Sequence, residues 1–202
     1  MKQRLEKIID ISEMQVSTFH SFAKDLLEDN ILVSGIGMSS GVMSRASQLV
    51  WGLKNIDTFD LQYIELGYNT AEIIESIIDS ISTFKDELVG HQELTSYLVK
   101  KLEQDLGEDE RSFFLKLADM AKVYEKYQTF QRSRAIIDFD DMIVEAVKLL
   151  RIRPNIARKY QEKFKHIFID EFQDNNFAQL ELVKLISNAG NVTAVGDDDQ
   201  CI

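Results

Sequence analysis

Adjacent carboxylates end a short apolar stretch near the carboxyl end of the chain. Asp170 and Glu171 follow the run HIFI at 166–169, and Gln173 and Asp174 come directly afterwards. If this run is a buried strand, a turn at its end can aim both acids into one cleft. One carboxylate can then hold Mg²⁺ beside a phosphate, while its neighbour orients or deprotonates water. The alternative is a pair of exposed acids that cap the following helix, and both interpretations stay open for this segment alone.

A second apolar run, NVTAV at 191–195, also ends in acid. Asp197, Asp198 and Asp199 follow it, and three adjacent carboxylates repel one another unless solvent or a cation is near. Gln200 comes next and could contact both a phosphate and a neighbouring element. A solvated acidic turn is the alternative, but two such endings in one sheet favour a site.

The segment between these runs has the pattern of a helix. It spans 176–190, and Gly190 lies just past the expected helix end. The side chains expected to face inward are Phe177, Leu180, Val183 and Ile186. Strand, helix and strand of these lengths predict a βαβ unit with parallel strands. Ligands of such sheets bind at the carboxyl ends of the strands, where both acidic clusters fall.

The segment EMQVSTFH at 13–20 predicts a strand, followed by a helix over 19–30. Ser17, Thr18, His20 and Ser21 would lie where the strand ends, and hydroxyls at a helix N-terminus can hold a phosphate. Phe19 or His20 could stack on a base. The simpler alternative is a helix cap with a buried aromatic side chain, which this segment taken alone favours.

The rest of the chain is predicted to be mainly helical, with a loop at 31–41. One apolar stripe at helical spacing comprises Ile73, Ile74, Ile77, Ile78, Ile81 and Phe84. A second comprises Phe113, Leu117, Met120, Tyr124 and Tyr127. Asp138 is predicted to cap the helix that follows it, and Pro154 to open another. The window 149–165 is the most basic, and it either follows a nucleic-acid backbone or forms a solvated helix face.

Composition narrows the class of protein. The 202 residues carry a net charge of -11, which argues against a polyanionic partner unless a local basic track exists. One cysteine, Cys201, excludes a disulfide framework and a cysteine zinc site, and a reducing, cytoplasmic setting is expected. No apolar run approaches the roughly 20 residues that span a bilayer, so no membrane partner is expected.

Four motifs, in order and spacing, resemble the UvrD/Rep/PcrA family of superfamily 1 DNA helicases. IFIDEFQDNN is similar to their Walker B motif, DEFQDTN, and AVGDDDQCI to the following VGDDDQSIY. VSTFHSFA resembles the TFHSF motif, and DFDDMI the DFDDL helix. The resemblance implies an α/β fold class, mostly helical with a small parallel sheet: a fragment of a RecA-like domain plus a helical insertion. It implies core segments at 1–29 and 161–202 around an insertion at 30–160.

The resemblance also implies roles for single residues. Asp170 would hold Mg²⁺ on ATP, Glu171 would polarise the attacking water, and Gln200 would sense the γ-phosphate. Gln173 and Asp174 would couple hydrolysis to DNA movement. The residues implied to contact single-stranded DNA are Thr18, Phe19 and His20, whereas the insertion would face duplex DNA.

The departures from the family pattern matter as well. The sequence holds no G-x-x-x-x-G-K-S/T loop to cradle phosphates, and Asn175 and Cys201 replace the usual threonine and serine. We therefore expect part of a 3′-to-5′ helicase that does not hydrolyse ATP by itself. An exposed sheet edge would make a dimer plausible. The alternatives are a DNA- or protein-binding helical module with a decayed ATPase site, and a piece of a related nuclease-fused helicase.

Overall fold

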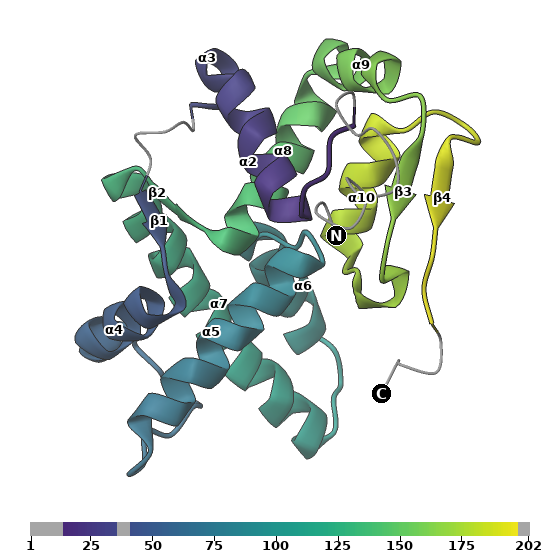
Figure 1. Ribbon diagram of the computed structural model, residues 1–202. Helices are drawn as coiled ribbons and strands as arrows, with labels where there is room; N and C mark the ends of the chain where they lie inside the picture. Colours follow the sequence, from purple (N-terminus) through teal and green to yellow (C-terminus); the bar gives the residue numbers. More distant parts are fainter. Residues whose placement is uncertain (1–13, 36–40, 198–202) are drawn as a thin grey trace.

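The computed structural model describes residues 14–35 and 41–197 (Figure 1). The α-helices are α2 Phe19–Asp29, α3 Ile31–Ser34, α4 Arg45–Asn55, α5 Thr70–Asp86, α6 His91–Leu102, α7 Glu108–Arg134, α8 Phe139–Ile152, α9 Pro154–Lys163 and α10 Phe177–Ile186. The short 3₁₀ helices are η1 Ile56–Thr58 and η2 Phe172–Asp174. The strands are β1 Gly41–Met43, β2 Ile136–Asp138, β3 Ile167–Ile169 and β4 Val192–Ala194. The expected fold class, mostly helical with a small parallel sheet, is confirmed.

The described strands form two separate parallel pairs. β3 pairs with β4, with Ile167 opposite Val192 and Ile169 opposite Ala194, and α10 connects them. This is the expected βαβ unit. β1 pairs with β2 in the same sense, with Gly41 opposite Ile136. The sequence did not predict this second pair, because three-residue strands carry almost no periodic signal and their pairing joins segments far apart in the chain.

Two local expectations were wrong. Residues 14–18 form no strand: they have no ladder partner among the described residues, and α2 begins at Phe19. The predicted loop at 31–41 contains α3, which directly continues from the end of α2. Residues 36–40 of that loop lie outside the described residues. The helix start at residue 19 agrees with the prediction, whereas one further short helix follows Asn30 where a loop was expected.

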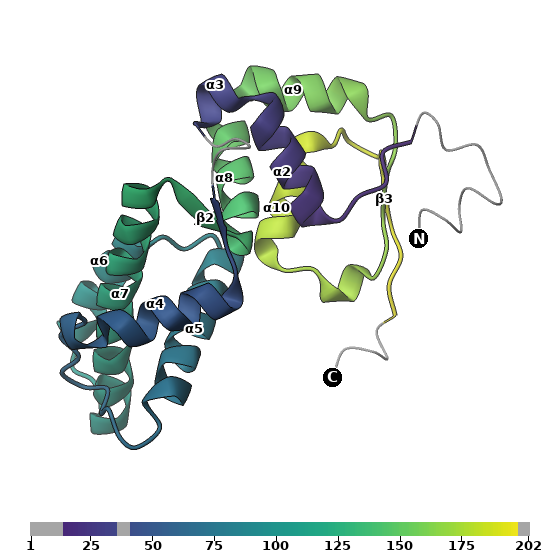
Figure 2. The ribbon, with the colours of Figure 1, turned by 60° about the vertical axis from the view of Figure 1, so that its left-hand side comes forward.

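The buried apolar side chains of the described residues form three cores. The first core unites α2, α8, α9 and α10, with Leu27, Val147 and Leu182 at its centre. The second core lies between α4, α5 and α7, around Trp51 and Ile77. The third core joins α6 to the N-terminal half of α7. Figure 2 shows the first core's helices beside β3, and the helices of the other two cores on the opposite side.

These cores correct part of the predicted stripes. Phe113 is 59% exposed and Phe114 is buried in its place, because the first half of α7 packs against α6 and its second half against α4 and α5. In α10, Phe177 is 41% exposed, whereas Ala178 and Leu182 are buried. The isoleucine stripe of α5 is confirmed as a helix face, with Ile74, Ile77, Ile78 and Ile81 buried.

The helix starts follow local chemistry. Asp138 caps α8, as predicted: its side chain accepts a hydrogen bond from the backbone N–H of Asp141, and the Asp141 side chain accepts one from the backbone N–H of Asp138. Reciprocal bonds of this kind satisfy two otherwise unpaired donors. Pro154 stands in the first turn of α9. None of the described helices is both long enough and apolar enough to cross a membrane.

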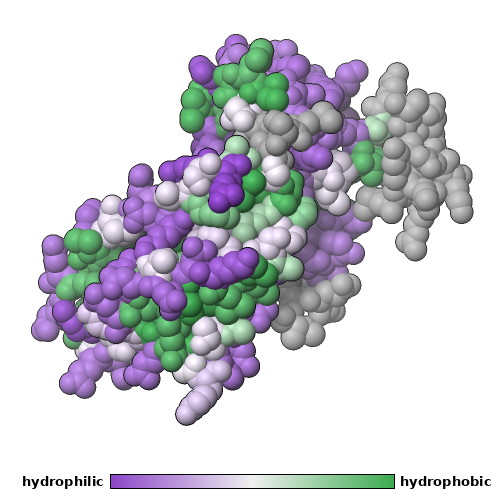
Figure 3. All heavy atoms as spheres, turned by 90° about the vertical axis from the view of Figure 1, so that its left-hand side faces the viewer, coloured by the Kyte–Doolittle hydropathy of each residue, from purple (hydrophilic) through white to green (hydrophobic). Residues whose placement is uncertain are grey.

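Hydrophobic side chains also reach the surface. Figure 3 shows them gathered in patches on the face that carries β1 and α4. The exposed apolar residues of these two elements are Val42, Val50 and Leu53. Exposed apolar patches are typical of contact surfaces.

Candidate functional site

The acids at the end of β3 lie on the surface. Asp170 and Glu171 are exposed, and the backbone turns sharply there because Glu171 has a left-handed φ of 52°. That conformation is unfavourable for a residue with a side chain, and it occurs preferentially at functional sites. Hydrogen bonds hold the turn from both strands, since Val195 donates to Ile169 and Phe172 donates to Val195.

Gln173 joins the two acidic strand ends. Its side-chain Nε2 donates to Oε2 of Glu171 over 2.8 Å, and its Oε1 accepts from the backbone N–H of Asp197 over 3.0 Å. The segments after β3 and β4 therefore meet at one edge of the sheet, as the sequence predicted. A Cβ on Gly196 would lie 2.6 Å from Oε1 of Gln173 and 3.3 Å from the Gln173 backbone nitrogen, so a larger residue there would require the Gln173 side chain to shift.

The helix-cap interpretation of the acids is wrong. α10 is capped by Asn176, whose Oδ1 accepts from the backbone N–H of Gln179 over 2.9 Å. Asp170 and Glu171 are thus not engaged in capping this helix. Asp174 donates its backbone N–H to the carbonyl of Glu171, and Asn175 donates its side-chain amide to the carbonyl of Phe172. These bonds make the segment from Glu171 to Asn176 one compact turn.

The N-terminal candidates have a structural role that is visible. Thr18 caps α2, and its Oγ1 accepts from the backbone N–H of Ser21 over 3.2 Å. Phe19 is half-buried against the first core, and the ring of His20 meets Phe139 edge-on at 6.2 Å between centroids. This agrees with the simpler alternative of a cap with a buried aromatic. Among the described residues, these three share no hydrogen bond or ring contact with the Glu171 turn, and their DNA-binding role stays a prediction.

Some of the residues singled out in the sequence are not described by the structure. Gln200, Asp198, Asp199 and Cys201 lie outside the described residues. The described residues contain no cluster of three or more metal-ligating side chains. Mg²⁺ is usually held by one or two carboxylates together with water and phosphate oxygens, so the exposed Asp170 and Glu171 pair fits that ion.

Some of the cations in the basic window at 149–165 have partners within the chain. Arg151 forms an ion pair with Glu181 of α10, with Nη2 2.8 Å from Oε2. Lys163 lies over the ring of Phe164 at 5.2 Å and donates to Gln15. Arg153 and Arg158 are exposed. The window is therefore mainly a solvated helix face with a few cations available to a ligand.

A buried polar cluster escaped the sequence analysis. The Nζ of Lys85 lies 2.6 Å from Asp138 Oδ2 and 2.7 Å from Asp141 Oδ1, and Lys85 is 1% exposed. The amide and hydroxyl groups that also donate to these carboxylates belong to Gln48, Tyr127 and Gln131. One signal was available: Lys85 stands four residues after Ile81, on the apolar stripe of α5, where a lysine requires a buried partner.

The charges of this cluster depend on one another. Burial alone would lower the pKa of Lys85, but the two carboxylates outweigh it and raise this pKa. Burial would raise the pKa of Asp138, but Lys85 and the surrounding donors lower it. Burial raises the pKa of Asp141 to about 6 against the effect of Lys85, and the charge of Asp138 adds to this rise. One cation thus serves two carboxylates, of which Asp138 holds its charge more firmly.

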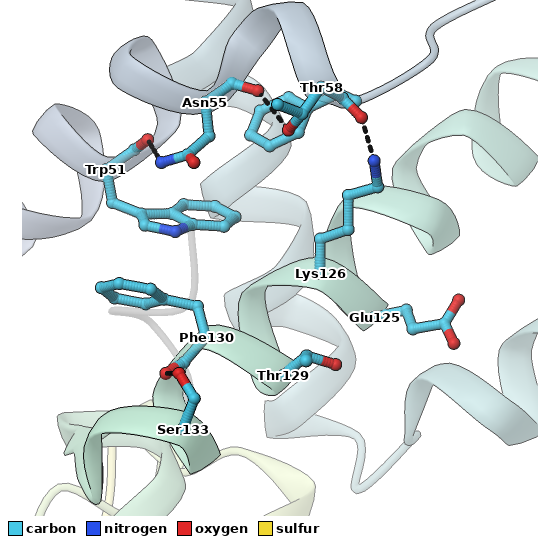
Figure 4. A pocket seen from close by; sticks show the side chains of 9 residues that line it. Trp51, Asn55, Thr58, Glu125, Lys126, Thr129, Phe130 and Ser133 are labelled. Carbon is cyan, nitrogen blue, oxygen red and sulfur yellow. Dashed lines mark hydrogen bonds between the residues drawn. The ribbon is translucent and has the colours of Figure 1, made fainter.

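A cavity of about 440 Å³ lies between α4, η1 and α7 (Figure 4). Trp51 and Phe130 line it with ring centroids 5.8 Å apart. Lys126 reaches across it and donates to the backbone carbonyl of Thr58. No predicted site residue lies on these elements, so the cavity is separate from the acidic strand ends.

The fold is that of an α/β protein with exposed acids at the carboxyl ends of parallel strands, which is where ligands of such sheets bind. The chain belongs to the UvrD/REP helicase N-terminal domain family, whose model matches residues 1–202. It is 30% identical over 207 residues to the ATP-dependent DNA helicase PcrA of Bacillus subtilis and 26% identical over 206 residues to the ATP-dependent DNA helicase Rep of Escherichia coli. It is 31% identical over 211 residues to a probable DNA helicase II homolog of Rickettsia felis. Each comparison covers 100% of this chain but only 25% to 28% of the relative, so the chain spans about a quarter of the length of these proteins.

Proposed function

We propose that this chain is part of the motor of an ATP-dependent DNA helicase that moves 3′ to 5′ on single-stranded DNA. The observation that carries the proposal is the Gln173 bridge, which joins the Glu171 carboxylate to the end of β4. Exposed acids at the ends of two parallel strands fit a bound Mg²⁺–nucleotide. The family membership and the relatives' names support the same activity.

The residues have distinct roles in this proposal. Asp170 would hold Mg²⁺, which would supply positive charge beside the nucleotide phosphates. Glu171 orients and deprotonates the attacking water, held in place by Gln173. Gln200 senses the terminal phosphate, Asp174 belongs to the coupling turn, and Thr18, Phe19 and His20 contact DNA.

The proposed domain boundaries start from the segments that the sequence predicted. The sequence predicted a RecA-like core at 1–29 and 161–202, and a helical insertion at 30–160 that faces duplex DNA. In the structure, α8 and α9 share the first core with α2 and α10. This packing supports extending the RecA-like body to include these two helices.

The test is DNA-stimulated ATP hydrolysis by the full-length protein that carries this chain. Glu171→Gln keeps the size of the side chain and removes its basicity, so the rate should fall by roughly 10²-fold or more while nucleotide binding persists. Glu162→Gln, an exposed change on α9, is the matched control and should leave the rate unchanged. Equal rates for wild type and Glu171→Gln would refute the assigned role.

The isolated 202-residue chain gives a second test. It holds no phosphate-cradling glycine loop with its lysine, so it should not turn over ATP even with single-stranded DNA present. Measurable turnover would contradict this. If the full-length wild-type protein binds DNA but hydrolyses no ATP, the binding-module alternative replaces the motor.

A further inference from the structure

The C-terminal end of α5 touches the helix that follows the acidic turn. The side-chain Nδ2 of Asn176 donates to Oδ1 of Asp86 over 2.5 Å. The same side chain caps α10 through its Oδ1, which accepts from Gln179. Asn176 therefore uses both ends of its amide, one for its own helix and one for α5. The contact joins residues 90 positions apart and links the second-core helices to the Glu171 turn.

The last turn of α5 is fixed on its other sides as well. Ser82 donates to Asp140 of α8 over 2.6 Å, and Lys85 holds Asp138 and Asp141. The chain then turns at Leu88, which has a left-handed φ of 57° and packs against the first core. These contacts fix the last turn of α5 against the start of α8.

The acidic turn gives a short path from Glu171 to Asn176. Four residues separate them, and the backbone N–H of Asp174 donates to the Glu171 carbonyl over 2.9 Å. Gln173 bonds the Glu171 carboxylate. A displacement of Glu171 is thereby transmitted to Asn176 through a compact turn rather than absorbed by a loop.

The surroundings of Asp86 are unfavourable for a carboxylate. Asp140 faces it from α8 and Glu87 lies on its own helix, while Asn176 of α10 is the neutral donor and Lys85 is engaged with Asp138 and Asp141. Burial, followed by the charges of Asp140 and Glu87, raises the pKa of Asp86 to about 6. Residues that are costly to local stability are concentrated at functional sites.

We propose that Asp86 and Asn176 are a positioning pair that ties the helical unit of α4–α7 to the acidic turn, so that nucleotide-driven shifts of Glu171 move these helices. This inference rests on the proposed motor function. The pair touches neither nucleotide nor DNA in this assignment. The pair fixes the position of the helices relative to the turn. Without it, ATP hydrolysis would continue but would no longer drive strand separation.

Exchanging the two side chains tests the pair, because the double variant keeps the net charge while the single variant does not. Asn176→Asp retains a good helix cap but replaces the donor with a second carboxylate. Adding Asp86→Asn restores one donor and one acceptor in the opposite order. In the full-length protein, Asn176→Asp should keep DNA-independent ATP hydrolysis within about twofold and lower strand separation per ATP by about tenfold. The double variant should regain at least half of the wild-type value. Unchanged strand separation in Asn176→Asp, or no recovery in the double variant, would overturn the proposal.

A second measurement on the 202-residue chain requires no ATP hydrolysis. Gln173→Ala loosens the acidic turn by freeing Glu171. It should raise amide hydrogen exchange at Glu87 and Leu88 at least threefold in the wild-type background and leave it unchanged in the Asn176→Asp background. Equal increases in hydrogen exchange in both backgrounds would refute the positioning role of the pair. If the hydrogen-exchange pattern is as expected but the full-length protein hydrolyses no ATP, the motor function is rejected and the link between Asp86 and Asn176 is retained.

Discussion

Replacing Lys85 with methionine tests the buried cluster directly. Methionine has a similar length, so the packing volume is nearly kept while the cation is lost. Asp138 and Asp141 would then be buried without a counter-charge, although both now lie within 2.7 Å of the Lys85 Nζ. Removal of one partner from a buried pair typically costs about 3–5 kcal/mol. The total stability of a domain is about 5–15 kcal/mol, so the variant should lose a large fraction of it.

The pH dependence of this loss has a defined sign. Without Lys85, the pKa values of both carboxyl groups should rise, because burial and mutual repulsion are no longer opposed. A carboxyl whose folded pKa lies above its unfolded pKa binds protons more tightly in the folded state. Stability of the variant should therefore increase as the pH falls through these raised values, and the deficit should shrink between pH 7 and pH 5.

Through these two groups, wild-type protein should lose stability towards both extremes of pH. The lowered pKa of Asp138 contributes stability that is complete above its unfolded pKa and lost as the pH falls towards the folded one. The raised pKa of Lys85 contributes stability that is complete below its unfolded pKa and lost as the pH rises through the folded one.

The assay is urea and thermal unfolding of the 202-residue chain at several pH values. At pH 7 the midpoint temperature of Lys85→Met should fall by about 6–20 °C, since each kcal/mol moves a domain of this size by about 2–4 °C. Lys148→Met is the control: it breaks an exposed pair with Glu145, and such pairs contribute about 0–1 kcal/mol. A loss below about 1 kcal/mol for Lys85→Met, or a deficit that does not change with pH, would refute the reasoning.

Two further substitutions test the helical unit by the same unfolding assay. Asp119→Ala removes the buried carboxylate that accepts the backbone N–H groups of Gln62, Tyr63 and Ile64 within 3.1 Å, and should cost about 3 kcal/mol because buried donors lose a charged acceptor; a cost no larger than that of the exposed Asp60→Ala would contradict this. Gly52→Ala adds a Cβ 2.4 Å from Cγ2 of Ile74, and overpacking of about 1–3 kcal/mol should exceed the helix-propensity gain of about 1 kcal/mol. A more stable Gly52→Ala protein would show that α4 and α5 can separate without cost.

Local signals in the sequence predicted what local chemistry determines. Asp138 with Asp141, and Pro154, marked helix starts correctly, and the apolar runs at β3 and β4 gave the parallel unit and the edge where the acids meet. The β1–β2 pair and the partners of Lys85 were missed, because each depends on contacts between segments 50 or more residues apart. Phe113 was misplaced for a related reason: α7 changes packing partners along its length, and no single stripe describes it.

Because α7 is long, a small tilt of this helix at the buried cluster displaces its N-terminal end. This helix has 27 residues and is therefore about 40 Å long. Its C-terminal half supplies Tyr127 and Gln131 to the cluster, while its N-terminal half carries α6. Glu108 lies about 29 Å along the helix from Tyr127, so a tilt of about 5° at the cluster would move the N-terminal end of α7 by roughly 2.5 Å. Under the proposed coupling, a small change at the acidic turn would become a displacement of a few ångströms at the end of α7 that carries α6.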